Sequence, residues 1–315
     1  MNKGYKKIIL MVCIVLMVGL VGYKLFNDRK VKSENQLTND QNTSANKKSN
    51  QEEKNKEQTN ANKDKSTEVK KEREFKEGKL KYNDISVPVL MYHSIDYEKG
   101  NELRVPKEKF KEQMQYLKDN DYTTLTLDEL YSFLVNNKPI PEKSVVITFD
   151  DGYEDNYSNA YPILKEFGFN ATIFVITNAI DNEKPFITSA QLKEMEQNGI
   201  DIESHTLAHD ELNKLPYDKQ VETLKGAREF IEKKLNKKVK YIAYPFGKWN
   251  NDTIKALKET GYDMAFTTVG GWSNKSQGIY TLHRVYVSAN YDMNEFKRRL
   301  TNPKYNVSHN KSNNN

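Results

Sequence analysis

Between residues 80 and 303 the chain alternates short, β-branched apolar segments with segments whose apolar residues recur at helical spacing. The predicted strands are residues 87–93, 144–150, 171–176, 200–205, 239–244 and 264–268. The predicted helices are residues 106–120, 127–135, 157–167, 189–197, 218–235 and 251–260. This alternation predicts an α/β fold in which about seven parallel strands are covered by helices, closed into a barrel or left open and doubly wound. In both arrangements, functional residues gather at the carboxyl ends of the strands.

The regions that flank this segment differ from it in composition. Residues 27–79 contain few large apolar side chains and are rich in Asn, Lys, Glu, Gln, Ser and Thr. Such a segment cannot bury enough apolar surface to offset the entropy lost on ordering. We therefore predict a disordered polar linker at residues 27–79, a folded domain at residues 80–303 and a disordered tail at residues 304–315.

The N-terminus predicts export from the cytoplasm. Lysines in the first seven residues precede an uncharged run at residues 8–23, slightly shorter than the roughly 20 residues of a spanning helix. A cleaved signal peptide is the alternative. However, no small-residue cleavage site follows the run, and Lys24 can lengthen the span by snorkelling. We predict an uncleaved membrane anchor at residues 1–26, with the remaining chain outside the cytoplasm.

Charge and cysteine content exclude several other classes. The net charge of +5 is small for 315 residues, and Lys and Glu are mixed along the chain. No basic stripe with interleaved aromatic residues is present, which argues against nucleic acid as a partner. The single cysteine, Cys13, lies in the apolar N-terminal run, so an intrachain disulfide is impossible. Nothing in the sequence implies a protein partner.

Two neighbouring carboxylates end the predicted strand at residues 144–150. Asp150 and Asp151 are followed by Gly152, a pattern that is also good turn chemistry. Adjacent side chains at a strand terminus usually point in different directions. One of the two carboxylates can therefore bind a metal while the other stays free.

Two histidines follow the predicted strand at residues 200–205. His205 and His209 lie four residues apart, so a helical turn here would place both imidazoles on one side, able to bind one ion. With Asp151 they provide two imidazoles and one carboxylate, which leaves positions open for water and substrate. Zinc in such a site activates water for hydrolysis. The same donor set also suits a non-haem iron oxygenase, although Asp150 is more useful as a hydrolytic base.

Three segments, taken in order and spacing, resemble the signatures of the polysaccharide deacetylase family (carbohydrate esterase family 4). They are ThrPheAspAspGlyTyr at residues 148–153, HisThrLeuAlaHis at residues 205–209 and TyrProPheGly at residues 244–247. The resemblance spans roughly residues 87–287. It implies a distorted (β/α) barrel that hydrolyses N-acetyl groups on amino sugars. The branch it most resembles, the poly-N-acetylglucosamine deacetylases, has circularly permuted barrel strands, which we expect here too.

The resemblance also implies roles for individual residues. Asp151, His205 and His209 would bind a divalent metal, zinc by default, with cobalt, nickel or manganese as alternatives. Asp150 would be the general base. The backbone N–H of Phe246 would stabilise the oxyanion, and Tyr244 of the same motif is expected to contact substrate.

The chain departs from the family pattern at two positions. Many members carry an arginine, oriented on the catalytic aspartate, where this chain has Ala243. We predict that Arg284 replaces it from a later strand. The general acid, often a histidine on a late strand, is predicted to be His93, which follows the early predicted strand; His283 is the alternative.

Two further aromatic residues, Tyr153 and Trp272, are predicted to line the acetyl site or stack on sugar rings. The expected substrate is an N-acetylated polysaccharide outside the cell, either poly-N-acetylglucosamine or the glycan strands of peptidoglycan. A catalytically silent glycan-binding protein is the remaining alternative. It is disfavoured because a binding module has no need for a free base beside a metal ligand.

Overall fold

Seven parallel strands close into a barrel in the computed structural model, which describes residues 73–306. Around the barrel the order is β5, β6, β7, β8, β9, β10 and β2, and β2 pairs with β5 to complete the ring. The barrel strands are β2 (Val89–Tyr92), β5 (Ser144–Phe149), β6 (Ala171–Val175), β7 (Ile200–Ser204), β8 (Tyr241–Ala243), β9 (Met264–Gly270) and β10 (Leu282–Tyr286). The predicted parallel α/β sheet is confirmed, in its closed form. Circular permutation relative to other family members stays a prediction.

Three short strands lie outside the barrel ring. They are β1 (Leu80–Lys81), β3 (Thr123–Thr124) and β4 (Ile140–Pro141). The strand β3 extends the sheet beside the start of β5, whereas β1 and β4 form an antiparallel pair of their own. Contacts with the folded domain begin before residue 80, because Arg73 donates 2.6 Å hydrogen bonds to the buried carboxylate of Glu129.

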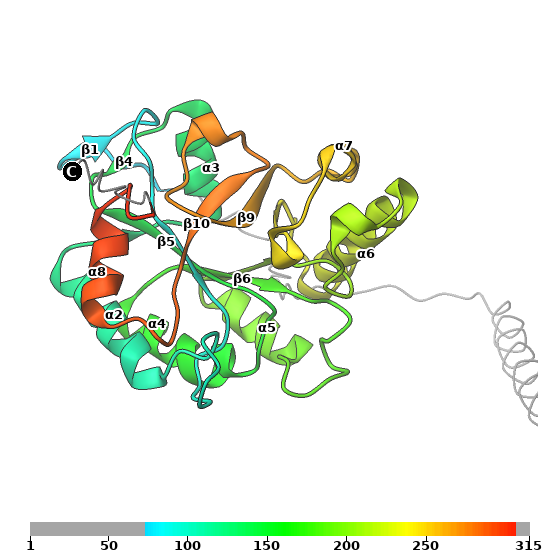
Figure 1. Ribbon diagram of the computed structural model, residues 1–315, viewed down its shortest axis with the longest axis horizontal. Coiled ribbons are helices and arrows are strands. Elements are labelled where there is room, and N and C mark those ends of the chain that lie inside the picture. Colours follow the sequence, from blue (N-terminus) through cyan, green and yellow to red (C-terminus); the bar gives the residue numbers. More distant parts are fainter. Residues whose placement is uncertain (1–72, 307–315) are drawn as a thin grey trace, which may run out of the picture. The chain divides into compact units, whose positions relative to one another are not determined.

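The helices connect successive strands and cover the outside of the barrel (Figure 1). They are α2 (Lys107–Asp119), α3 (Leu127–Asn136), α4 (Tyr161–Phe167), α5 (Ser189–Gln197), α6 (Tyr217–Leu235), α7 (Asn251–Glu259) and α8 (Met293–Thr301). Local sequence fixes several of their ends. Capping boxes begin α3 at Thr126, α5 at Thr188 and α7 at Asn250, and each cap contributes about 1 kcal/mol.

The predicted helix at residues 157–167 is only partly α-helical. Its first turn, η1 (Asn156–Ala160), is a π-helix, in which the N–H of Tyr161 donates to the carbonyl of Asn156. Pro162 follows and has no N–H to continue the regular ladder, which favours the wider turn. The wide turn directly follows the segment that carries the two neighbouring aspartates.

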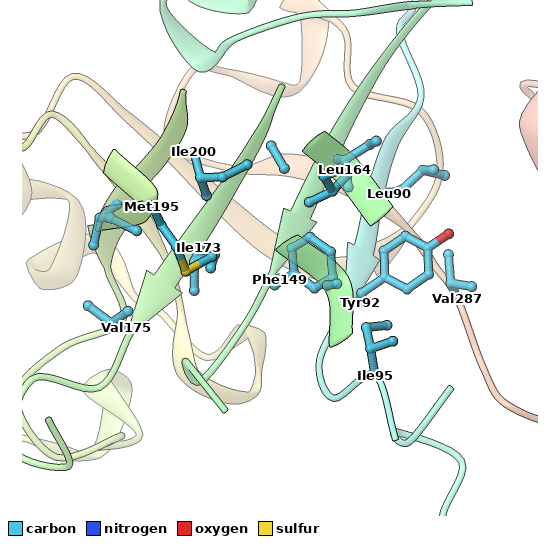
Figure 2. Close-up of a cluster of buried hydrophobic side chains, with 14 of the residues drawn as sticks. Leu90, Tyr92, Ile95, Phe149, Leu164, Ile173, Val175, Met195, Ile200 and Val287 are labelled. Atoms are coloured by element: carbon cyan, nitrogen blue, oxygen red, sulfur yellow. The ribbon is translucent and has the colours of Figure 1, made fainter. Parts of the chain in front are cut away.

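Alternate residues of each strand face two different apolar clusters. The outer cluster lies between the strands and the helices; Figure 2 shows its residues from β2, β5 and β6, including Tyr92 and Phe149, whose rings stack at 5.4 Å. The inner cluster joins barrel-facing residues such as Phe174 and Phe266 to buried residues of α3. Because α3 packs against the first residues of several strands, it covers the amino end of the barrel and leaves the carboxyl end for polar groups.

The predicted membrane anchor, most of the predicted linker and most of the predicted tail lie outside the described residues, and their boundaries stay predictions. Within residues 73–306, no helix combines the length and the apolar character needed to cross a membrane.

Candidate active site

The strands deliver the predicted site residues to the carboxyl end of the barrel. Asp150 follows β5, and its backbone N–H donates to the carbonyl of Tyr92, the last residue of β2, at 2.9 Å. This bond sets the two strand ends level, so that His93 and Asp150 emerge side by side. His205 follows β7, whose last residue pairs with β8. Residues far apart in the sequence therefore meet because they end neighbouring parallel strands.

Arg284 of β10 forms a buried bidentate ion pair with Asp150. Its two terminal nitrogens lie 2.7 Å from the two carboxylate oxygens, and neither side chain is more than 2% exposed. The guanidinium also donates to Thr148 Oγ1 at 3.2 Å and to the carbonyl of Thr267 at 3.1 Å. These bonds hold the guanidinium group of Arg284 in one orientation, and the carboxylate of Asp150 with it.

The ion pair decides the protonation state of Asp150. Burial alone would raise the pKa of this carboxyl, but the charge and hydrogen bonds of Arg284 outweigh burial and hold the pKa below its ordinary value. Asp150 is therefore an anion at all physiological pH values.

Asp151 turns away from Asp150 toward two imidazoles. Its φ of 74° and that of 78° at Gly152 reverse the chain directly after β5. A side chain at Gly152 would come within 3.0 Å of Val175, so glycine allows the close approach of this turn to β6. As a result, Asp151 Oδ1 lies 3.3 Å from both His205 Nε2 and His209 Nε2.

The segment between the two histidines is a turn and not the helical turn that was considered from their spacing. Thr206 has a φ of 71° and His209 a φ of 59°, values that an α-helix does not contain. The hydroxyl of Thr206 accepts the N–H of His209 at 3.1 Å and closes the turn. The two rings still converge, with centroids 4.9 Å apart.

The donor set fits a metal cation. His205 Nδ1 lies 2.7 Å from the carbonyl of Ala243, which requires a proton on that nitrogen and turns Nε2 toward Asp151. Asp151 Oδ1 is buried and has no hydrogen-bond partner. One potential ligand atom from each of Asp151, His205 and His209 lies within 4.8 Å of the others. Two imidazole nitrogens and a carboxylate oxygen that face one point are the pattern of a cation site.

His93 is held at the mouth of the barrel by its backbone. The amide of Asn156 donates to the carbonyl of His93 at 2.8 Å, and Asp155 accepts from Ser94 Oγ at 2.6 Å and from the N–H of Ile95 at 2.7 Å. His93 Nδ1 is buried without a partner. Burial lowers the pKa of His93, although the charges of Asp150 and Asp151 partly oppose the shift.

The alternative, His283, lies on the other face of β10. It is adjacent to Arg284, whose side chain points into the barrel, and neighbouring residues of a strand point to opposite faces. Its ring packs near Gly271, where an added Cβ would lie 3.1 Å from Nδ1. The structure therefore brings His93, and not His283, toward the site.

The four predicted substrate-contacting residues are placed differently. Phe246 is 55% exposed and its ring lies 4.4 Å from that of His209, while Tyr153 stacks on Phe186 at 5.3 Å. The side chain of Tyr244 is fully buried, with its hydroxyl bonded to the carbonyl of Tyr280. The indole of Trp272 donates to the carbonyl of Arg299 in α8. The structure thus brings Phe246 and Tyr153 to the site and keeps Tyr244 and Trp272 in the packing of the domain.

Sequence reasoning missed part of a cavity that opens at the metal-ligand cluster. The cavity has a volume of about 420 Å³, and besides Asp151 and His209 it is lined by Asn178, Glu183 and Phe186 of the loop between β6 and α5. This loop carries no motif. The only available signal was its place after a strand that neighbours β5.

These features define a class, namely α/β-barrel enzymes that hold a polar catalytic cluster at the carboxyl ends of their strands. Comparison with known proteins narrows the class. The polysaccharide deacetylase family model matches residues 137–265. The chain is 47% identical over 202 residues to YxkH of Bacillus subtilis (strain 168), whose name assigns it to the polysaccharide deacetylases; the match covers 64% of this chain and 71% of that protein.

Two further similar proteins have names that state a deacetylase activity. The chain is 32% identical over 240 residues to the poly-β-1,6-N-acetyl-D-glucosamine N-deacetylase of Staphylococcus aureus (strain MSSA476), covering 67% of this chain and 81% of the relative. The structure of the Streptococcus pyogenes deacetylase PplD in complex with acetate superposes with a TM-score of 0.66 at 32% identity, over 69% of this chain and 98% of that one. The chain belongs to the polysaccharide deacetylase family, and the predicted resemblance is confirmed.

Proposed function

We propose that this protein is a metal-dependent hydrolase that removes N-acetyl groups from N-acetylglucosamine residues of a polysaccharide outside the cell, releasing acetate. One observation carries the proposal. A buried, partnerless oxygen of Asp151 faces two imidazole nitrogens at 3.3 Å, beside an Asp150 carboxylate that is locked in its ionised form. A deacetylase needs both a cation site and an adjacent base, and the chain belongs to a deacetylase family.

Asp151, His205 and His209 would hold the cation, with zinc as the first choice because two imidazoles and a carboxylate suit it. A cation bound there would polarise the acetamide carbonyl and favour deprotonation of the attacking water. The bond between His205 Nδ1 and the carbonyl of Ala243 orients one ligand before any metal binds.

Asp150 is the proposed general base. Its ionised carboxylate accepts a proton from the water molecule that attacks the acetamide carbon. Arg284 is the proposed positioning residue: its two hydrogen bonds at 2.7 Å fix the direction of the carboxylate and keep it ionised. The arginine that many family members carry near the proline–aromatic motif would thus be supplied here from β10.

His93 is the proposed general acid, because it is the histidine held beside Asp150 at the mouth of the barrel. As the imidazolium, it would donate a proton to the sugar nitrogen as the carbon–nitrogen bond breaks, which yields the amine and acetate. Burial disfavours the protonated ring in the free protein, whereas the charges of Asp150 and Asp151 favour it. The backbone N–H of Phe246 is the proposed donor to the oxyanion, since its residue lies against His209 at a turn with a φ of 56°.

Poly-N-acetylglucosamine is the proposed polymer, supported by the relative from Staphylococcus aureus that is named for this substrate. Peptidoglycan glycan strands, which carry the same acetamide, are the competing substrate. The proposed location is the outer face of the cell membrane, with residues 1–26 as the anchor. This location rests on the charge and apolar pattern of the N-terminus.

The test is acetate release from β-1,6-linked and β-1,4-linked N-acetylglucosamine oligomers by the full-length protein. We expect a chelator to stop release, added zinc to restore it, and Asp150→Asn to lower kcat by roughly 10²- to 10⁴-fold. Thermal unfolding of the variant serves as the control, because the substitution removes the negative charge that pairs with Arg284.

The two alternative functions and the alternative substrate each predict a different outcome of the same experiment. Tight binding of one cation without acetate release from any acetylated glycan would reject the deacetylase and favour an iron oxygenase. Glycan binding without turnover would favour a silent binding protein. Faster release from the β-1,4-linked oligomers would favour the peptidoglycan strand as substrate.

A further inference from the structure

The cavity beside the metal-ligand cluster is larger than one acetamide group requires. Its volume of about 420 Å³ lies within the roughly 300–1,000 Å³ of pockets that hold drug-sized ligands. A second sugar residue of a polymer chain can therefore lie in it while its neighbour is presented to the catalytic groups.

The wall of the cavity is fixed to the catalytic segment. The N–H of Glu154 donates to the carbonyl of Pro185 at 2.7 Å, and the N–H of Ile187 donates to the carbonyl of Gly152 at 3.0 Å. Between these bonds the rings of Tyr153 and Phe186 stack with an interplanar angle of 16°. The loop that carries Glu183 is thus bonded to the turn that carries Asp151, and the wall exists before substrate arrives.

The cavity wall carries one carboxylate outside the metal-ligand cluster. Among the described residues that line it, Asp151 and His209 belong to the metal cluster, and no lysine or arginine is present. Burial raises the pKa of Tyr153 to about 12, so its hydroxyl stays neutral. Glu183, an exposed residue, is the one remaining carboxylate of the lining. A ligand that enters beside the reacting sugar therefore meets the aromatic wall and the carboxylate of Glu183.

The proposed reaction itself produces the matching ligand. Hydrolysis converts a neutral acetamide into a primary amine, which takes up a proton at neutral pH. We propose that Glu183 binds the ammonium group of an already deacetylated glucosamine residue, next to the sugar that is being deacetylated. The stacked rings favour the same cation, since an aromatic face attracts positive charge. This inference rests on the proposed function and adds a substrate preference: partly deacetylated stretches of the polymer are better substrates than untouched ones.

The kinetic test compares two tetrasaccharides in the full-length protein. One is fully acetylated, and the other carries a single free amine beside an acetylated sugar. We expect wild type to favour the second, and Glu183→Gln to lower kcat/KM on the second by about tenfold, the usual effect of losing a charged hydrogen bond, with little change on the first. Glu98→Gln is the control, because Glu98 is an exposed acid that pairs with Arg104 and does not line the cavity.

A binding measurement on the metal-free protein tests the same contact without turnover. A tetramer of glucosamine, titrated calorimetrically, should bind Glu183→Gln about tenfold more weakly than wild type or Glu98→Gln. A tetramer of N-acetylglucosamine should bind all three alike. Equal losses for both oligomers, or no loss for the amine, would overturn the proposal. If neither tetrasaccharide releases acetate, the proposed function fails, and the titration still decides whether Glu183 binds the amine.

Discussion

Two residues of the same barrel face, Glu203 and His205, belong to buried polar clusters of opposite character. Glu203 is 2% exposed and lies beside the start of β8, where it accepts hydrogen bonds from the backbone N–H groups of Lys240 and Tyr241 at 2.9 and 2.7 Å and from Lys237 Nζ at 3.0 Å. The cluster of His205 lies beyond the carboxyl ends of the strands and contains partnerless atoms on Asp151 and His93.

The difference shows that burial of charge alone does not identify a functional site. Around Glu203 the chain itself supplies the hydrogen-bond donors to the carboxylate, so the cluster joins β7 to β8. No acceptor of this carboxylate has to be satisfied by a ligand. Around His205 the chain turns two imidazole nitrogens and a carboxylate oxygen without a hydrogen-bond partner toward one point, where an external cation would complete the site. The predictions below test this division, from the largest expected effect to the smallest.

Removing the carboxylate of Glu203, whose hydrogen bonds are all supplied by the chain, should lower the free energy of unfolding and leave catalysis unchanged. Glu203→Ala leaves two buried N–H groups unpaired and breaks a buried ion pair, so we expect the free energy of unfolding to fall by about 3–5 kcal/mol. The kcat of the folded fraction should be unchanged. Denaturant titration and acetate release measure the two quantities.

Glu222→Ala is the matched control, because Glu222 pairs with Lys219 on an exposed helix face and its loss should cost about 1 kcal/mol or less. Where Glu203→Ala does not accumulate as folded protein, Glu203→Gln gives a milder form of the same test. A Glu203 variant that stays stable and loses turnover would contradict the division, since it would place function at the Glu203 cluster.

Removing the carboxylate of Asp151 should have the reverse effect: stability should change little, and metal binding should weaken. Asp151→Asn keeps the shape of the side chain and removes an oxygen that has no hydrogen-bond partner, so unfolding of the metal-free protein should change by about 1 kcal/mol or less. Affinity for zinc should fall by about 100-fold or more, because the loss of a ligand exceeds that of a supporting group. Competition with a chelating dye measures the affinity; an unchanged value would reject Asp151 as a ligand.

The positions of the strand ends could be predicted from the sequence more accurately than the backbone conformation near the metal ligands. Short β-branched runs placed β5 and β7 within a residue of their observed bounds, and Asp150 and His205 with them. The reversal at Asp151 and the turn at Thr206 depend on left-handed backbone in non-glycine residues, for which the sequence carries little signal. Arg284 was predicted to reach Asp150, but its burial between Phe174 and Phe266 depends on barrel closure, which no local pattern encodes.

Loss of the hydrogen bond that supports the backbone of His93 should reduce activity less than loss of a metal ligand does. It should lower kcat and leave KM unchanged. Asn156→Ala removes the 2.8 Å hydrogen bond to the carbonyl of His93, and we expect kcat to fall by about tenfold with KM unchanged, because the proton donor is displaced. Asn159→Ala is the matched control, since its amide donates to the carbonyl of Ile95 at 2.9 Å, two residues farther along the same loop. Equal losses in both variants would show that the loop needs general support and not a bond at His93.

The smallest expected effect is a pH dependence of stability that His93 causes in the metal-free protein. Burial lowers the pKa of His93 in the folded state, so below pH about 6.5 the unfolded chain binds more protons than the folded chain does. The neutral imidazole thus contributes stability that is complete above that pH and declines as pH falls. His93→Gln lacks this term, whereas His205 and His209 titrate in both proteins. The difference in unfolding free energy between wild type and variant should therefore shift against wild type between pH 8 and pH 5; a constant difference would show that His93 is not held neutral at the carboxyl end of the barrel.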